Sequence, residues 1–116
     1  MKKKIYNKLI RDKIPGIIKK SGSIPEITIL DEADFRKALK VKMTEEAQEL
    51  LEAESTDDVL NELADVEELV RAIAKNYSIS LRELEEHRKA KLHERGGFKK
   101  KLFLVSVVRS SDEPDY

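Results

Sequence analysis

Apolar residues recur every three or four positions through the middle of the chain, a spacing that predicts amphipathic helices. From Glu32 to about Glu54 the pattern contains no Gly or Pro and predicts one long helix. The stretch Ser55-Thr56-Asp57-Asp58 interrupts the pattern and supplies an N-cap for a second long helix, from Asp58 to about Lys75. Ser80-Leu81-Arg82-Glu83 is a capping box that opens a third long helix, which ends at Gly96-Gly97.

The segments that flank these helices carry different patterns. Residues 7–20 predict a first short helix that Pro15 can divide into two pieces. Residues 26–30 and 102–108 are short runs rich in β-branched or apolar residues, and they predict two strands that can pair with each other. The polar residues 109–116 predict a loose tail. We therefore expect an all-α fold, an antiparallel helical bundle with a small two-stranded β element.

The composition narrows the class of protein. A chain of 116 residues suffices for one domain, which we expect to cover 1–116 with its folded part at about 6–108. Lys+Arg and Asp+Glu number 23 each, and a formal net charge of zero argues against a nucleic-acid polymer as partner. The absence of cysteine excludes a disulfide framework and a thiolate metal site. No apolar run has the length of a membrane span, so we expect a cytoplasmic protein with no membrane partner.

Acidic residues fall on the apolar faces of the two central helices. On a helical wheel of 32–54, Glu46 lies inside the apolar stripe and Glu49 at its edge. The stripe consists of Phe35, Leu39, Met43, Ala47, Leu50 and Ala53. On the wheel of 58–75, Glu62 falls between Leu69 and Ile73, and Asp65 lies just beyond Leu69. The apolar stripe of this helix consists of Val59, Leu63, Val66, Val70 and Ile73, with Leu69 at one margin. Carboxylates that converge in a bundle repel one another and resist desolvation, and a hard divalent cation such as Mg²⁺ removes both problems.

The third long helix carries the opposite charge. Arg88, Lys91 and Arg95 fall on or beside its apolar face, one per turn, where they can meet phosphate oxygens. Acids on two helices and bases on a third suit a site for a metal–polyphosphate complex. The wheels leave a second interpretation open, an internal acid–base network between Glu46, Glu62, Arg88 and Lys91 that needs no ligand.

Four elements, in this order and spacing, resemble a known family. They are Glu45-Glu46-Ala47-Gln48-Glu49, then Glu62-Leu63-Ala64-Asp65, then Lys91-Leu92-His93-Glu94-Arg95-Gly96-Gly97-Phe98, and the opening Tyr6-Asn7-Lys8-Leu9-Ile10-Arg11-Asp12. The first two resemble the Glu-Glu-x-x-Glu…Glu-x-x-Asp signature of the all-α NTP pyrophosphatases, which include MazG, the dimeric dUTPases and phosphoribosyl-ATP pyrophosphohydrolase. The last two resemble the ending and the opening of a single-domain MazG-like subgroup.

The resemblance implies a set of site residues. Mg²⁺, with Mn²⁺ as the alternative ion, would be held by Glu46, Glu49, Glu62 and Asp65. Glu45 would be a further ligand or would orient the attacking water, which makes Glu45 and Glu46 the catalytic pair. Lys91 and Arg95 would bind phosphate, and the helical wheel adds Arg88 to them. Lys8 and Arg11 match the subgroup's opening and are expected as additional substrate contacts.

The sequence is consistent with three functions. The resemblance favours Mg²⁺-dependent hydrolysis of nucleoside triphosphates to the monophosphate and pyrophosphate, by a homodimer or homotetramer. One form of this activity is house-cleaning of damaged nucleotides. The related reaction on phosphoribosyl-ATP in histidine biosynthesis is the second, and a helical interaction module without enzymatic activity is the third.

Overall fold

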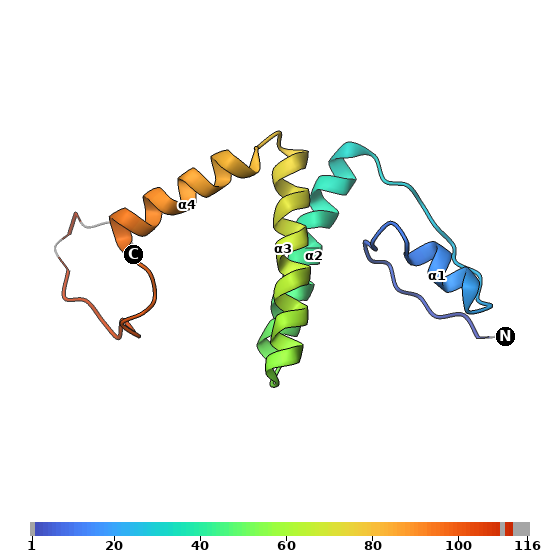
Figure 1. Cartoon of the computed structure of the whole chain (residues 1–116), viewed down its shortest axis with the longest axis horizontal. Coiled ribbons are helices and arrows are strands. Elements are labelled where there is room, and N and C mark those ends of the chain that lie inside the picture. Colours follow the sequence, from blue (N-terminus) through green and yellow to red (C-terminus); the bar gives the residue numbers. More distant parts are fainter. Residues whose placement is uncertain (1, 110, 113–116) are drawn as a thin grey trace. The chain divides into compact units, whose positions relative to one another are not determined.

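The structure is a computed structural model of the chain and describes residues 2–109, 111 and 112. Within this part of the chain, four helices and no strands are found (Figure 1): α1 (Ile14–Lys20), α2 (Glu32–Glu52), α3 (Thr56–Asn76) and α4 (Leu81–Arg95). The expected all-α fold is therefore confirmed. None of the helices in the described part of the chain is both long enough and apolar enough to cross a lipid bilayer.

The chain forms two compact units, Met1–Leu84 and Glu85–Tyr116. The first unit contains α1, α2, α3 and the first turn of α4, and the second contains the rest of α4 and the segment that follows it. Whether these two units act as the single domain predicted for 1–116 is not decided by this division, and the single domain stays a prediction. Residue 110 and residues 113–116 of the expected loose tail lie outside the described residues.

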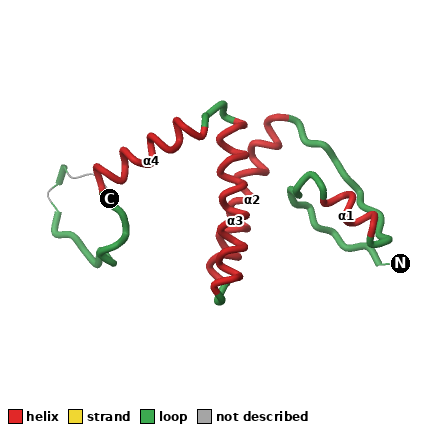
Figure 2. The backbone as a smooth tube through the Cα atoms, viewed as in Figure 1, coloured by secondary structure: helices red, strands yellow, loops and turns green. Residues whose placement is uncertain are grey.

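Helices α2 and α3 form a hairpin in the first unit (Figure 2). Each begins where the sequence provides a cap: the side chain of Asp31 accepts a hydrogen bond from the backbone N–H of Asp34, and that of Ser55 accepts one from Asp58. The connection between the helices is only Ala53 to Ser55, so the two helices are necessarily antiparallel neighbours. The two long helices predicted from the sequence are found within a few residues of their expected ends.

The interface between α2 and α3 is narrow. Among the described residues, the buried apolar ones are Leu39 of α2 and Ala74 of α3, at 3% and 4% exposure, and Glu46, two turns after Leu39 on α2, is the buried charged residue, at 6%. Other positions of the predicted stripes, such as Met43 and Val66, are half-buried, whereas Ala47 and Leu63 are exposed. A pair of helices can cover only one side of each partner, and this explains why most positions of the two stripes are half-buried and not fully buried.

A polar network closes the end of the hairpin that lies opposite the Ala53–Ser55 turn. Arg36 donates to the side chain of Asn76 (Nε–Oδ1, 2.7 Å) and to its backbone carbonyl (NH2–O, 3.1 Å). Asn76 in turn donates to Glu32 (3.3 Å), and the Arg36 guanidinium lies 4.1 Å from the centre of the Tyr77 ring. The last carbonyl group of α3, that of Asn76, thereby gains a cationic partner, which stabilises a helix C-terminus.

The N-terminal helix is shorter than the sequence predicts. Residues 7–20 were expected to be helical, but α1 starts only at Ile14, with Pro15 in its first turn. Proline is well suited to the first turn, because its missing N–H has no partner there, and it opposes a helix that would continue through it from earlier residues. Pro15 therefore starts the helix instead of dividing it.

The predicted β element is wrong. Residues 26–30 and 102–108 lie in different units, and neither forms a strand in the described structure. Most of their side chains are exposed, Ile29 at 93% and Val105 at 89% among them. A strand needs a hydrogen-bonded neighbour and a face that packs on a core, and an isolated two-stranded ribbon is marginal in water even when both are present.

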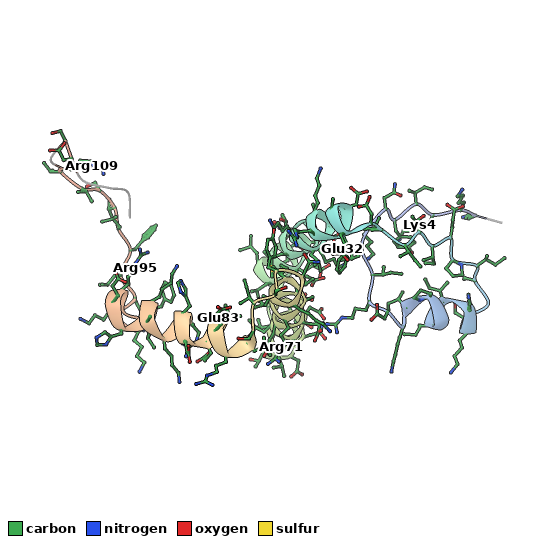
Figure 3. The ribbon with its side chains drawn as sticks, turned by 90° about the horizontal axis from the view of Figure 1, so that it is seen from above. Lys4, Glu32, Arg71, Glu83, Arg95 and Arg109 are labelled. Carbon is green, nitrogen blue, oxygen red and sulfur yellow. The ribbon has the colours of Figure 1, made fainter. Side chains whose placement is uncertain are left out.

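Helix α4 begins and ends as the sequence predicts. Ser80 Oγ accepts a hydrogen bond from the backbone N–H of Glu83 (3.0 Å), as in a capping box. The helix ends at Arg95, and Gly96 follows with φ +82°, a left-handed conformation that suits glycine at a helix C-terminus. No residue of α4 is buried, and Figure 3 shows Glu83 near the beginning of the helix and Arg95 at its end.

Candidate metal centre

Three carboxylates meet where α2 faces α3. Oxygen atoms of Glu46 and Glu49, from α2, and of Glu62, from α3, all lie within 4.8 Å of one another. Glu46 and Glu49 are three residues apart and therefore neighbours on one helical face. The antiparallel hairpin places Glu62 opposite them. The structure thus brings together three of the four predicted metal ligands, from the two helices that the sequence indicates.

The cluster is buried on one side and open on the other. Glu46 is only 6% exposed, Glu62 is half-buried, and Glu49 is exposed. A ligand bound here would meet fixed carboxylate oxygens on the inner side and solvent or substrate on the side of Glu49. This is the arrangement of a site that keeps exchangeable coordination positions, as magnesium sites in enzymes usually do.

Two oxygen atoms of the cluster have no partner. Glu46 Oε2 and Glu62 Oε2 are buried and accept no hydrogen bond from any described residue. An ionised carboxylate carries no donor, so these acids can satisfy each other only if one of them holds a proton. A buried acceptor without a partner is costly, and a proton or a cation shared between the two side chains would remove that cost.

The pKa of Glu46 reflects this environment. Burial is the main factor that raises the pKa of Glu46, from the usual 4.5 to about 7. Hydrogen bonds with Glu49 and Glu62 that require the protonated form raise it further, as do the negative charges of Glu49 and Asp65. Near neutral pH the Glu46 carboxyl is therefore protonated in part of the molecules, and a cation could displace this proton.

The donor set fits a hard divalent cation. All three side chains offer anionic oxygen, and no described sulfur or imidazole atom joins them. Mg²⁺ and Mn²⁺ prefer such ligands, whereas zinc sites usually contain histidine or cysteine. The two buried oxygens without partners supply the positions at which such an ion would be held.

Lys42 is a residue of the site to which the sequence analysis gave no role. Its Nζ lies 3.1 Å from Glu45 Oε2 and 3.7 Å from Glu46 Oε1, and its side chain is only 19% exposed. The spacing could have identified it, because residues three and four positions apart on a helix are neighbours. Lys42 partly neutralises the cluster but does not reach the two oxygens that lack partners.

Asp65 has a partner outside the three-carboxylate cluster. Arg11, in the segment that precedes α1, lies 2.6 Å from it (NH2–Oδ1). Asp65 is half-buried, and its charge still contributes to the raised pKa of Glu46. Arg11, expected as an additional substrate contact, thus binds one of the predicted metal ligands. Lys8 comes from the same segment and lines a pocket together with Lys42 and Glu45.

The cations predicted to bind phosphate belong to the second unit. Lys91 and Arg95 are exposed on α4. Arg88 pairs with Glu85 one turn earlier (NH2–Oε1, 2.5 Å), and this pair lowers the pKa of Glu85 and raises that of Arg88. Phosphate binding by these three residues and the alternative acid–base network with Glu46 and Glu62 both stay predictions.

Comparison with known proteins identifies one relative of undefined role. Over 52 residues the chain is 40% identical to an uncharacterised protein of Mycolicibacterium smegmatis. The match covers 45% of this chain, and the chain spans about half, 53%, of that protein's length. No protein-family model matches the chain, and no solved structure matches it.

Proposed function

We propose that this protein is a Mg²⁺-dependent hydrolase that cleaves nucleoside triphosphates to the monophosphate and pyrophosphate. The observation that carries the proposal is the three-carboxylate cluster, in which two buried oxygens have no hydrogen-bond partner. A chain that needed these residues only for packing would gain stability by replacing Glu46 with an apolar residue, since buried acids without partners are costly. Their presence is accounted for if a cation occupies the cluster.

Each acid has a role in this proposal. Glu46, Glu49 and Glu62 would hold the ion, with Asp65 as the fourth ligand. When bound, the ion supplies the charge that orients the phosphates, favours deprotonation of water and stabilises the transition state of phosphoryl transfer. Glu45 is half-buried and held by Lys42, and it would accept a proton from the attacking water.

The family resemblance, not the cluster, suggests a nucleotide as the substrate. House-cleaning of damaged nucleotides is the form of the activity that we favour, and phosphoribosyl-ATP is the alternative substrate. Lys91, Arg95 and Arg88 would contribute phosphate contacts from α4. The protein's location in the cytoplasm is part of the same proposal.

Self-association would complete the bundle. Three leucines of the hairpin are exposed, Leu51 at 79%, Leu60 at 65% and Leu63 at 49%. A second copy that packs on them would convert a two-helix layer into a larger core, and apolar faces left open on small domains commonly serve this purpose. We propose a homodimer or homotetramer, which analytical ultracentrifugation would detect.

A pyrophosphate-release assay with Mg²⁺ tests the activity. The panel should contain standard nucleoside triphosphates, oxidised and deaminated ones, and phosphoribosyl-ATP. We expect turnover by the wild type, none in excess EDTA, and none by Glu46→Gln or Glu62→Gln. Glu67→Gln is the matched control, because Glu67 lies on α3 in a surface ion pair with Arg71 and should remain active.

Each outcome of the assay has a clear meaning. Turnover of phosphoribosyl-ATP alone would identify the histidine-pathway reaction. Full activity in both cluster variants would refute the site, and an inactive wild type that is folded and loaded with Mg²⁺ would favour a non-enzymatic interaction module. Circular dichroism of every variant establishes that loss of activity is not loss of fold.

A further inference from the structure

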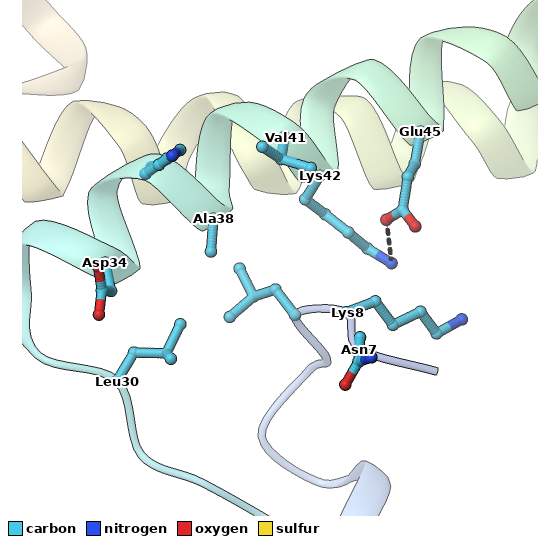
Figure 4. Close-up of a pocket in the computed structure, with 10 residues that line it drawn as sticks. Asn7, Lys8, Leu30, Asp34, Ala38, Val41, Lys42 and Glu45 are labelled. Carbon is cyan, nitrogen blue, oxygen red and sulfur yellow. Dashed lines mark ion pairs between the residues drawn. The ribbon is translucent and has the colours of Figure 1, made fainter. Parts of the chain in front are cut away.

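A pocket of about 280 Å³ lies between the N-terminal segment and α2 (Figure 4). Its size is near the lower end of the roughly 300–1,000 Å³ typical of small-molecule sites, so it can hold one small group but not a polymer. The residues that line it are Asn7, Lys8, Leu9, Leu30, Asp34, Lys37, Ala38, Val41, Lys42 and Glu45. All of them belong to the first unit, which also contains the carboxylate cluster.

The two ends of the pocket differ in chemistry. Leu30 and Ala38 form an apolar end, with the carboxylate of Asp34 at its margin (Figure 4). At the other end Lys8 and Lys42 extend on the same side as Glu45. Ligand sites commonly combine an apolar lining with a few polar groups that fix orientation, and this polarity suits a molecule with one weakly polar part and one anionic part.

Lys42 connects the pocket to the candidate metal centre. It lines the pocket, and the same ammonium group lies 3.7 Å from Glu46 Oε1 in the cluster. A phosphate bound at the charged end would therefore be adjacent to the acids proposed to hold the ion. Lysine is a point charge with three donors and binds phosphate oxygens well, so Lys42 could release Glu45 when an anionic ligand arrives.

From this arrangement we infer that the pocket binds the nucleoside part of a nucleoside triphosphate, while Lys42 and Lys8 bind its phosphates beside the carboxylate cluster. The inference rests on the proposed function for the reaction but assigns residues of its own. It places phosphate-binding cations in the same unit as the acids, on α2 and on the N-terminal segment, in addition to those expected on α4. It also gives the N-terminal segment a role in substrate recognition.

Binding measurements can test the inference apart from turnover. Calorimetry with Mg²⁺ would use two probes, ATP with a non-hydrolysable α,β-methylene bridge and inorganic tripolyphosphate, which lacks the nucleoside. Lys42→Met should weaken both probes by about tenfold or more, since hydrogen bonds between charged groups are worth that much. Lys8→Met should weaken both as well, and Ala38→Leu, which fills the apolar end, should weaken only the ATP analogue.

Two controls separate this role from a structural one. Lys40→Met changes a lysine on the same helix whose Nζ lies 5.1 Å from the Tyr77 ring centre, and it should bind both probes normally. The rise in melting temperature caused by Mg²⁺ alone should not shrink in Lys42→Met, because removal of a cation leaves the acids freer to hold the ion.

Failure of this inference is distinguishable from failure of the proposed function. If the wild type hydrolyses triphosphates while Lys42→Met, Lys8→Met and Ala38→Leu bind both probes as it does, the pocket assignment is overturned and the activity stands. If the wild type hydrolyses nothing but binds the probes in the Lys42-dependent way described, the pocket stands and the hydrolase is refuted. A wild type that binds neither probe overturns the pocket assignment.

Discussion

The two ends of the α2–α3 interface differ in whether their charged and polar groups have hydrogen-bond partners. Where α2 begins and α3 ends, Arg36 makes two hydrogen bonds to Asn76, which also donates to Glu32. Nearer the turn between the helices, the acids Glu46 and Glu62 face each other, and each keeps one buried oxygen without a partner. The Arg36 end shows that polar groups of this hairpin find hydrogen-bond partners where the sequence places donors opposite acceptors.

The difference separates a structural use of polar residues from a functional one. The Arg36 network contains donors and acceptors in matching numbers, and it stabilises the fold without any ligand. The carboxylate cluster in its ionised form contains acceptors only, so it lowers the stability of the free protein and gains a partner when a cation binds. Variants at the two ends should therefore have opposite consequences for stability and activity.

The largest expected effect is the loss of activity when the cluster is altered. Glu46→Gln or Glu62→Gln should reduce kcat/KM by more than about 100-fold, because even residues that only support a metal ligand are typically worth 10–100-fold. Both variants should also lose the rise in melting temperature that Mg²⁺ produces in the wild type. Steady-state kinetics and thermal denaturation with and without Mg²⁺ measure the two effects. A Mg²⁺-induced shift that survives in both variants would contradict the assignment of the ion.

The next largest effect is on pH-dependent stability without metal. The pKa of Glu46 is raised from 4.5 to about 7, so between these values the folded state keeps a proton that the unfolded state has released. Stability attributable to Glu46 is therefore complete below pH 4.5, falls as the pH rises towards 7, and stays low above it. The total loss is at most about 3.5 kcal/mol, since one pKa unit corresponds to about 1.4 kcal/mol.

Glu46→Gln provides the comparison. The variant cannot ionise, so in EDTA it should match the wild type near pH 4 and be the more stable protein at pH 8. Urea denaturation across this range measures the difference. The control Glu67→Gln should follow the wild type closely, since its ion pair with Arg71 is exposed. Equal pH profiles for Glu46→Gln and the wild type would show that the Glu46 carboxyl is not held in its neutral form.

A smaller and opposite effect is expected at the other end of the interface. Arg36→Met removes two hydrogen bonds to Asn76 and the contact with the Tyr77 ring, which should destabilise the fold by roughly 1–2 kcal/mol. The activity of the folded fraction should be unchanged, because these residues do not take part in the cluster. Urea denaturation and kinetics at low temperature measure the two quantities. A variant as stable as the wild type would mean that the network is only a surface contact.

The helices were largely predictable because their signals are local. The caps Asp31, Ser55 and Ser80 and the stop at Gly96 lie within a few residues of the ends they fix. The burial of Glu46 followed from its position in the apolar stripe, as did its convergence with Glu62. Each of these features depends only on helical geometry and on one short turn.

The errors arose where a long-range partner decides the structure. Residues 26–30 and 102–108 have the composition of strands, but composition does not supply a neighbouring strand. The pairing of Arg11 with Asp65 joins residues 54 positions apart, and no periodic pattern indicates it. Lys42 is a different case. Its spacing from Glu45 and Glu46 indicates a contact on one helical face, so its ion pairs could have been predicted from the sequence.

The smallest effect is expected from substitution of Arg11, whose partner Asp65 lies next to the carboxylate cluster. Arg11→Met removes the ion pair with Asp65, at 2.6 Å, but the Arg11 side chain is 58% exposed, so the stability of the free protein should change by less than about 1 kcal/mol. Asp65 would then be free to join Glu46, Glu49 and Glu62, and Mg²⁺ should bind a few-fold more tightly than in the wild type. Competition with Mn²⁺ followed by electron paramagnetic resonance measures this affinity, and Lys13→Met, a nearby change of equal charge, is the control. Weaker binding in Arg11→Met would mean that Arg11 holds Asp65 in position for the ion instead of competing with it.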